Sequence, residues 1–327
     1  MGLTEKEKDI NYGICILRII FSFQVVMVHC NGGSFFYWIG SAVPFFMLTS
    51  FYLTYNTFNK SNYINIKRRI SRICIPYFGY AFISFVIISF LEVITTKHIV
   101  SYTDLLWQLL LGSSKLNPPL WFLSNLIICS AIIFLVSKYS LNKNKLFIII
   151  LITSFFIQYT GINSFIFSNL RFEIKWPLGR IIEMIPYACA GTLLASSGIL
   201  KKIHSNILAM FTICILLLFF KTHSIPTPTG FYNQGIQMFI NTILVFPLFY
   251  LANFEKLNTD IKKFILYISN YSLGIYCIHH IIILIYENTT NYSGTSFIRG
   301  STIYILSLFF SILISKIPFK WAASLVR

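Results

Sequence analysis

Apolar stretches long enough to cross a lipid bilayer recur along the whole sequence of 327 residues. A helix of about 20 apolar residues spans the hydrocarbon core, where every backbone polar group needs a partner within the protein. Only 11% of the residues are charged, whereas a typical soluble domain has about 25%. The sequence therefore predicts an all-α integral membrane protein embedded in the lipid bilayer, and not a soluble domain with a membrane tail.

We expect about ten transmembrane helices in a single domain that covers residues 1–327, with no separate soluble domain. The predicted spans are residues 11–29, 36–57, 73–95, 119–137, 146–160, 180–198, 205–220, 236–253, 265–286 and 300–317. The first is not a cleaved signal peptide, because it is too long, contains Arg18 and precedes no small-residue cleavage pattern.

Lysine and arginine residues in the loops predict the orientation. If the N-terminus is cytoplasmic, the inner segments carry eighteen of these residues and the outer loops carry six. Cytoplasmic loops of membrane proteins are enriched in positive residues, so this bias favours an N-in, C-in topology. The net charge of +16 follows from this topology and does not indicate nucleic-acid binding.

The first predicted span carries two ionisable residues on one helix face. Arg18 lies near its middle and His29 at its outer end, and the eleven steps between them make three helical turns plus about 20°. Their axial separation is roughly 16 Å, about half the hydrocarbon thickness. An arginine in hydrocarbon costs at least about 2.5–3.5 kcal/mol unless it faces a partner or a wet cavity. We therefore expect both side chains to face the interior of the bundle.

A cluster of arginines ends the predicted inner loop before the third span. It comprises Arg68, Arg69 and Arg72. Such a basic patch can simply set the topology of the neighbouring spans. Alternatively it forms an anion site at a helix N-terminus, because guanidinium groups match the geometry of phosphate oxygens.

Three further polar groups lie at the ends of predicted spans or within them. Trp121 either anchors the fourth span at the interface or stacks on a sugar ring. Arg180 and Glu183 either form a structural ion pair or line the same outer cavity as His29, where a carboxylate could orient the imidazole. Tyr276 and His279 share a face of the ninth span, where they either pack with satisfied hydrogen bonds or face the bundle interior. No histidine has metal-ligand spacing and the cysteines are scattered, so we expect no metal site.

In their order along the chain, these motifs resemble the membrane-integral acyltransferase-3 family. The resemblance extends over residues 11–317. The sequence departs from the family pattern at Phe51, because the family usually has glycine after the serine of the second span. The matching features are Arg18 and His29 separated by ten residues, Pro44-Phe45-Phe46 running to Ser50, Arg68-Arg69-x-x-Arg72, Leu120-Trp121-Phe122-Leu123, and Ser272-x-Gly274-Ile275-Tyr276-x-x-His279.

The resemblance implies a bacterial cell-membrane enzyme that transfers an acyl group across the bilayer. The donor is acyl-CoA, commonly acetyl-CoA, on the cytoplasmic side. The acceptor is a hydroxyl of a cell-surface polysaccharide, or of its lipid-linked precursor, on the outer side. The resemblance does not determine whether the transferred group is acetyl, succinyl or another acyl group, and it does not identify the acceptor.

The resemblance also suggests roles for individual residues. Arg18 would face the pantetheine arm or the thioester carbonyl, and His29 would act as a general base or carry the acyl group. The CoA phosphates would be bound by Arg68, Arg69 and Arg72. Substrate binding would be supported by Trp121, Arg180, Glu183, Tyr276 and His279.

A second hypothesis comes from a different functional class. The basic residues of a transporter or export component would recognise an anionic glycan without any chemistry. Such a protein would move glycan and leave the thioester of acyl-CoA intact, so release of CoA distinguishes the two.

Overall fold

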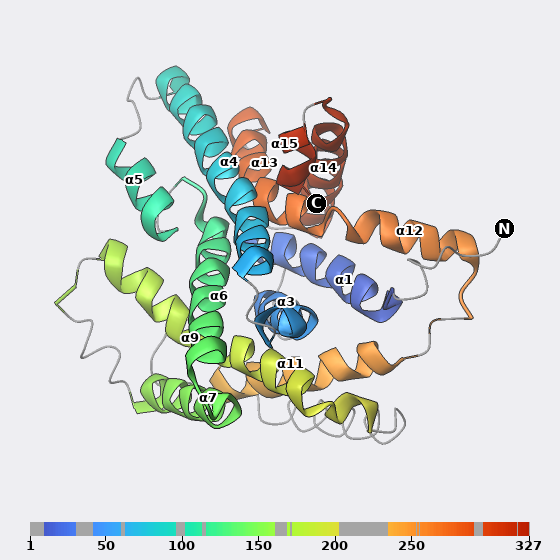
Figure 1. Cartoon of the computed structure of the whole chain (residues 1–327). Coiled ribbons are helices and arrows are strands. Elements are labelled where there is room, and N and C mark those ends of the chain that lie inside the picture. Colours follow the sequence, from blue (N-terminus) through green and yellow to red (C-terminus); the bar gives the residue numbers. More distant parts are fainter. Residues whose placement is uncertain are drawn as a thin grey trace.

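The structure is a computed structural model, and every regular element that it describes is a helix (Figure 1). It describes residues 10–30, 42–59, 63–95, 102–112, 116–160, 169–170, 172–202, 235–252, 254, 256–290, 297–318 and 320–326. The α-helices are α1 (Tyr12–His29), α3 (Ala42–Asn59), α4 (Tyr63–Thr95), α5 (Tyr102–Leu111), α6 (Trp121–Tyr139), α7 (Lys143–Thr160), α9 (Phe172–Ser197), α11 (Gly235–Leu251), α12 (Thr259–Ser269), α13 (Ser272–Thr290), α14 (Phe297–Lys316) and α15 (Lys320–Val326). Two 3-10 turns are η2 (Pro118–Leu120) and η3 (Ile199–Lys201). The predicted all-α class is confirmed for these residues.

Several of the described helices are long and apolar enough to cross a membrane. Five of them meet this requirement alone. A sixth span is added if α12 and α13, which are bent by 52° relative to each other, cross the membrane together. Those five are Tyr12–His29, Tyr63–Ile94, Pro118–Tyr139, Ile174–Ser197 and Phe297–Lys316. The chain is therefore a multi-pass membrane protein. Eight of the ten predicted spans overlap one α-helix each, 265–286 runs across the break between α12 and α13, and 205–220 lies outside the described residues. The count of ten and the N-in, C-in orientation therefore stay predictions.

The sequence prediction was wrong at several helix boundaries. Helix α4 begins at Tyr63, ten residues before the predicted span, so the arginine cluster lies inside a helix and not in a loop. Likewise α9 begins at Phe172 instead of residue 180, and α5 lies within a predicted outer loop. The prediction followed apolar runs, whereas a helix can continue into the headgroup region with its charged side chains in water.

Helix α1 lies among helices from both halves of the chain. It contacts α3 on one side and α11, α12, α13 and α14 on the others (Figure 1). Its buried side chains include Leu17, Phe21 and Met27, each at most 1% exposed. By contrast, α4 exposes Phe78, Phe82, Val86 and Phe90, each four residues after the last. Residues four apart share a helix face, so this stripe is the surface that α4 presents to lipid.

Helices α3 and α9 approach each other closely at Gly191. A Cβ atom at this position would lie 2.3 Å from the backbone oxygen of Leu48. Small residues allow such close contact between membrane helices. We predict that Gly191→Ala destabilises the protein by about 1–3 kcal/mol, measured as a lower melting temperature in detergent. Gly79→Ala is the matched control, because its Cβ would meet only the flexible side chain of Leu325, and equal melting temperatures for the two variants would contradict the prediction.

Candidate active site

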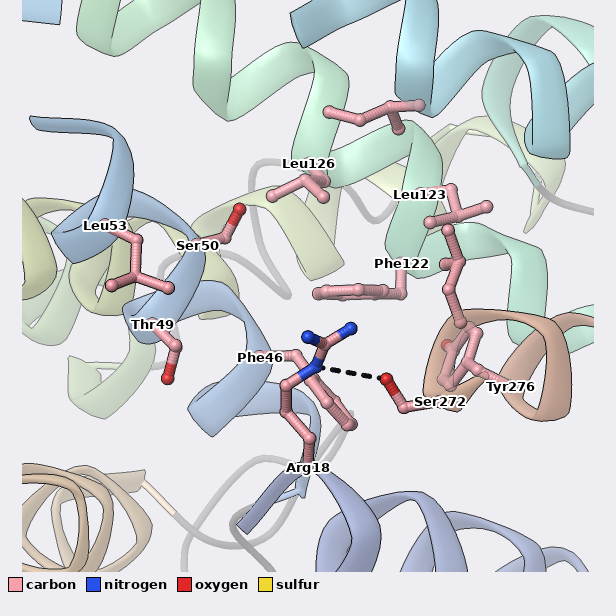
Figure 2. A pocket seen from close by; sticks show the side chains of 12 residues that line it. Arg18, Phe46, Thr49, Ser50, Leu53, Phe122, Leu123, Leu126, Ser272 and Tyr276 are labelled. Atoms are coloured by element: carbon pink, nitrogen blue, oxygen red, sulfur yellow. Dashed lines mark hydrogen bonds between the residues drawn. The ribbon is translucent and has the colours of Figure 1, made fainter. Parts of the chain in front are cut away.

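A pocket with a volume of about 220 Å³ lies between α1, α3, α4, α6 and α13 (Figure 2). Apolar and aromatic side chains form most of its wall, and Arg18 is the one charged residue among those that line it. The lining residues are Arg18, Phe46, Thr49, Ser50, Leu53, Ile73, Phe122, Leu123, Leu126, Ser272, Leu273 and Tyr276. Such a cavity can bind a mostly apolar ligand that carries one polar group.

Arg18 enters this pocket from the middle of α1. Its Nε donates a hydrogen bond to Ser272 Oγ over 3.2 Å, and its guanidinium points into the cavity (Figure 2). Within the described part of the chain, the terminal nitrogens of Arg18 form no hydrogen bond and no ion pair. A carbonyl oxygen or an anion in the pocket can therefore bind to them. In a water-poor cavity, such an interaction is much stronger than in water.

The predicted arginine cluster divides into an inward and an outward part. Arg69 donates from Nη2 to Ser50 Oγ over 2.8 Å and from Nε to Ser130 Oγ over 3.1 Å. Arg68 and Arg72, which lie one turn apart, are exposed. Arg69 thus ties α4 to α3 and α6 beside the pocket wall, while the other two face the surroundings.

Phe51, which departs from the family pattern, belongs to the same contact. Its side chain is completely buried, and the guanidinium of Arg69 lies 5.1 Å from the centre of its ring. A cation close to an aromatic face is stabilised by the ring quadrupole. The bulky side chain at this position is therefore accommodated by packing against the arginine.

His29 is the last residue of α1 and lies outside the pocket. Its side chain is exposed, and its ring centre lies 5.0 Å from that of His279 and 6.4 Å from that of His280. Both histidine partners belong to α13. The expected inward face of α1 therefore meets α13 at two points, Arg18 at one and His29 at the other.

One face of α13 connects these two points. Ser272, Tyr276 and His279 follow one another at intervals of four and three residues, which places them on one side of the helix. Ser272 binds Arg18, and Tyr276 lines the pocket and donates its hydroxyl to Pro119 O over 2.5 Å. His279 packs against His29. The predicted pair Tyr276 and His279 thus stands between the pocket and the imidazole of α1.

Residues 11–317 match the family model described as an acyltransferase domain. This chain belongs to the acyltransferase-3 family. No curated protein and no solved structure matches it. The enzyme is therefore an acyltransferase with several membrane helices, and the match extends over every element from α1 to α14.

In this acyltransferase, Arg180 is enclosed by aromatic rings and does not line the pocket. Its guanidinium lies 4.9 Å from the ring centre of Trp121 and 5.0 Å from that of Trp176, and its Nη1 donates to Glu183 Oε2 over 3.1 Å. Trp121 is only 5% exposed. The predicted ion pair between Arg180 and Glu183 is therefore formed. The guanidinium of Arg180 also covers a face of the Trp121 ring that a sugar would need for stacking.

Sequence reasoning missed several residues that the acyltransferase brings to the pocket. The sequence does not single out Thr49, and it marks Ser50 and Phe122 only as parts of motifs, because it does not show that α3 and α6 meet α1 and α13. In the described part of the chain, no group of three histidine, cysteine, aspartate or glutamate side chains could hold a metal ion.

Proposed function

We propose that this acyltransferase moves a short acyl group, such as acetyl, from cytoplasmic acyl-CoA to a hydroxyl of a cell-surface polysaccharide or its lipid-linked precursor. The protein would act in the cell membrane of a bacterium. The observation that carries the proposal is the guanidinium of Arg18, which lies in an apolar pocket and whose terminal nitrogens have no partner among the residues that the structure describes. A thioester arm fits this combination, because it is largely apolar and carries carbonyl oxygens.

The pocket volume supports a short acyl group. A cavity of about 150 Å³ takes up benzene, which corresponds to about 25 Å³ for each carbon atom. On this scale a pocket of about 220 Å³ holds roughly nine non-hydrogen atoms. That is the size of an acetyl thioester with the adjoining two-carbon unit and amide of the pantetheine arm. A long acyl chain would exceed it.

The directions of three helices agree with the predicted order of the spans. Residues 18 and 29 of α1 contact residues 272 and 279 of α13 in the same order, so the two helices run in the same direction. Helix α14 runs the opposite way, because Gly300 lies near Met27 and Tyr304 near Ser22. This is the alternation expected of a first, ninth and tenth span, whichever side of the membrane the termini lie on.

With the predicted N-in topology, the exposed Arg68 and Arg72, which lie near the start of α4, would be on the cytoplasmic side. There they are available to the phosphates of CoA, which guanidinium groups bind well. From this side, the arm of the donor would enter the pocket past Ser50, which Arg69 holds in place.

Arg18 and His29 are too far apart to act on the same atom. Their contacts on α13 are seven residues apart, which is about 10 Å along a helix. A general base and an oxyanion donor each need to lie within about 3 Å of the reacting group. We therefore assign Arg18 to a carbonyl of the donor arm and His29 to the acceptor side, with the thioester carbon between them near Tyr276.

The experiment that tests the proposal compares surface glycans from cells with and without the gene by mass spectrometry. We predict an added acetyl mass only when the protein is present. Membranes that contain the protein should also release CoA from acetyl-CoA when acceptor glycan is supplied, and far less from palmitoyl-CoA. Glycan movement with intact acetyl-CoA would instead favour a transporter.

A further inference from the structure

His279 has one nitrogen whose role is fixed by the backbone. The side chain is completely buried, and Nδ1 lies 2.7 Å from the carbonyl oxygen of Tyr276 and 3.2 Å from that of Ile275. Carbonyl oxygens only accept hydrogen bonds, so Nδ1 carries the hydrogen. In the neutral ring, Nε2 is then left with a lone pair.

That lone pair has no hydrogen-bond partner among the residues that the structure describes. A buried acceptor without a partner is costly, because it has lost its hydrogen bonds to water. The ring of His29 lies beside it, with centres 5.0 Å apart and planes inclined by 46°. A neutral imidazole offers one N–H, and an acceptor such as Nε2 is the group that this N–H needs.

Building on the proposed function, we propose that His279 is a positioning residue for His29, in which Nε2 of His279 accepts the ring N–H of His29. This hydrogen bond fixes the tautomer of His29. The lone pair of its other nitrogen is then available to the hydroxyl of the acyl acceptor. A base held by a third group in this way is a common arrangement in enzymes that transfer acyl groups.

The proton balance of the transfer follows from this pair. As the acceptor oxygen forms its bond to the acyl carbon, its proton moves to the free nitrogen of His29. The resulting imidazolium keeps its hydrogen bond to His279. The bond between the acyl carbon and sulfur then breaks with its electron pair on sulfur, and His29 returns the proton to the leaving CoA thiolate.

Two substitutions at position 279 separate positioning from packing. In His279→Asn, the side-chain amide keeps an N–H near the position of Nδ1, and no group remains near the position of Nε2. In His279→Gln, the longer side chain places its amide near the position of Nε2. We expect kcat of His279→Asn to fall about 10- to 100-fold, with KM for both substrates within about threefold. His279→Gln should recover about tenfold of that loss. Equal losses in both variants, or His279→Asn within about threefold of wild type, would overturn the inference.

His280→Asn is the matched control. This residue is the next one on α13, and its ring centre lies farther from His29, at 6.4 Å. We expect its kcat to stay within about threefold of wild type. If His280→Asn lost as much kcat as His279→Asn, the inference would be overturned. Within the described ranges, no backbone contact fixes a nitrogen of His280 as an acceptor, so the effect at position 279 would then not depend on one.

A second measurement does not depend on acyl transfer. Diethyl pyrocarbonate modifies neutral imidazole, and mass spectrometry of the purified full-length protein gives the rate at His29. We expect this rate to fall in His279→Asn and to recover in His279→Gln, because donation to an acceptor makes the other nitrogen more nucleophilic. An unchanged rate in His279→Asn would overturn the pairing. Absence of acyl transfer by the wild-type protein would instead count against the proposed function.

Discussion

Replacing His29 with alanine is expected to lower kcat for acyl transfer by about 10²- to 10⁴-fold, the usual contribution of a general base. The side chain is exposed at the end of α1, and among the described residues its ring contacts are to His279 and His280. Its removal therefore leaves the apolar core unchanged, and the melting temperature in detergent should stay close to that of wild type. Transfer of labelled acetyl from acetyl-CoA to acceptor glycan measures the effect.

The control for this variant is His280→Ala, which removes a neighbouring imidazole that we place outside the chemistry. It should retain activity within about threefold of wild type. Full activity of His29→Ala, with normal amounts of protein in the membrane, would rule out both roles of His29.

Labelled acetyl-CoA without acceptor distinguishes those two roles. An acyl carrier would take up label at His29 and release one CoA per enzyme in a burst, whereas a general base would do neither. The hydrogen bond proposed for His279 serves either role, because it leaves the other nitrogen of His29 as the nucleophile or the base.

The positions of most described helices along the chain were predictable from the sequence, and their ends were not. Hydropathy locates the segment of a helix that lies in hydrocarbon, because only there are charges strongly excluded. Beyond that layer nothing in hydropathy marks where a helix ends. This is why the prediction began α4 at residue 73, whereas the structure begins it at Tyr63.

The candidate site was predictable where it depends on the periodicity of one helix. Arg18 and His29 share a face of α1, and Tyr276 and His279 share one of α13, and the structure places these two faces against each other. The same periodicity could have separated Arg69 from Arg68, because adjacent residues on a helix point about 100° apart.

Contacts between different helices were beyond the sequence. Nothing in the local pattern indicates that Ser272 binds Arg18 or that Phe122 covers the pocket. The enclosure of Arg180 by Trp121 and Trp176 is a further example, since it depends on how α6 meets α9. Such contacts follow from packing between segments far apart in the chain.

Replacing Arg18 with methionine is expected to lower kcat/KM for acetyl-CoA by roughly 10- to 100-fold, mostly through a higher KM for the donor. This is the effect of losing a charge-assisted hydrogen bond of about 1.5–3 kcal/mol to a carbonyl of the arm. A role in the chemical step would lower kcat instead. The separation of Arg18 from His29 favours the effect on KM, and steady-state kinetics with varied acetyl-CoA measures both constants.

The stability of the same variant provides the stronger test. In the structure, Arg18 is a largely enclosed cation with one neutral hydrogen-bond partner, Ser272, and no carboxylate partner among the described residues. Replacing such a charge with an apolar side chain of similar length is neutral or stabilising. We therefore expect Arg18→Met to melt at the wild-type temperature or above while it loses activity. Ser272→Ala, which removes the partner but keeps the charge, should lose less than about tenfold in kcat/KM. A destabilised Arg18→Met variant with an unchanged KM would show that the arginine supports the fold and not the donor.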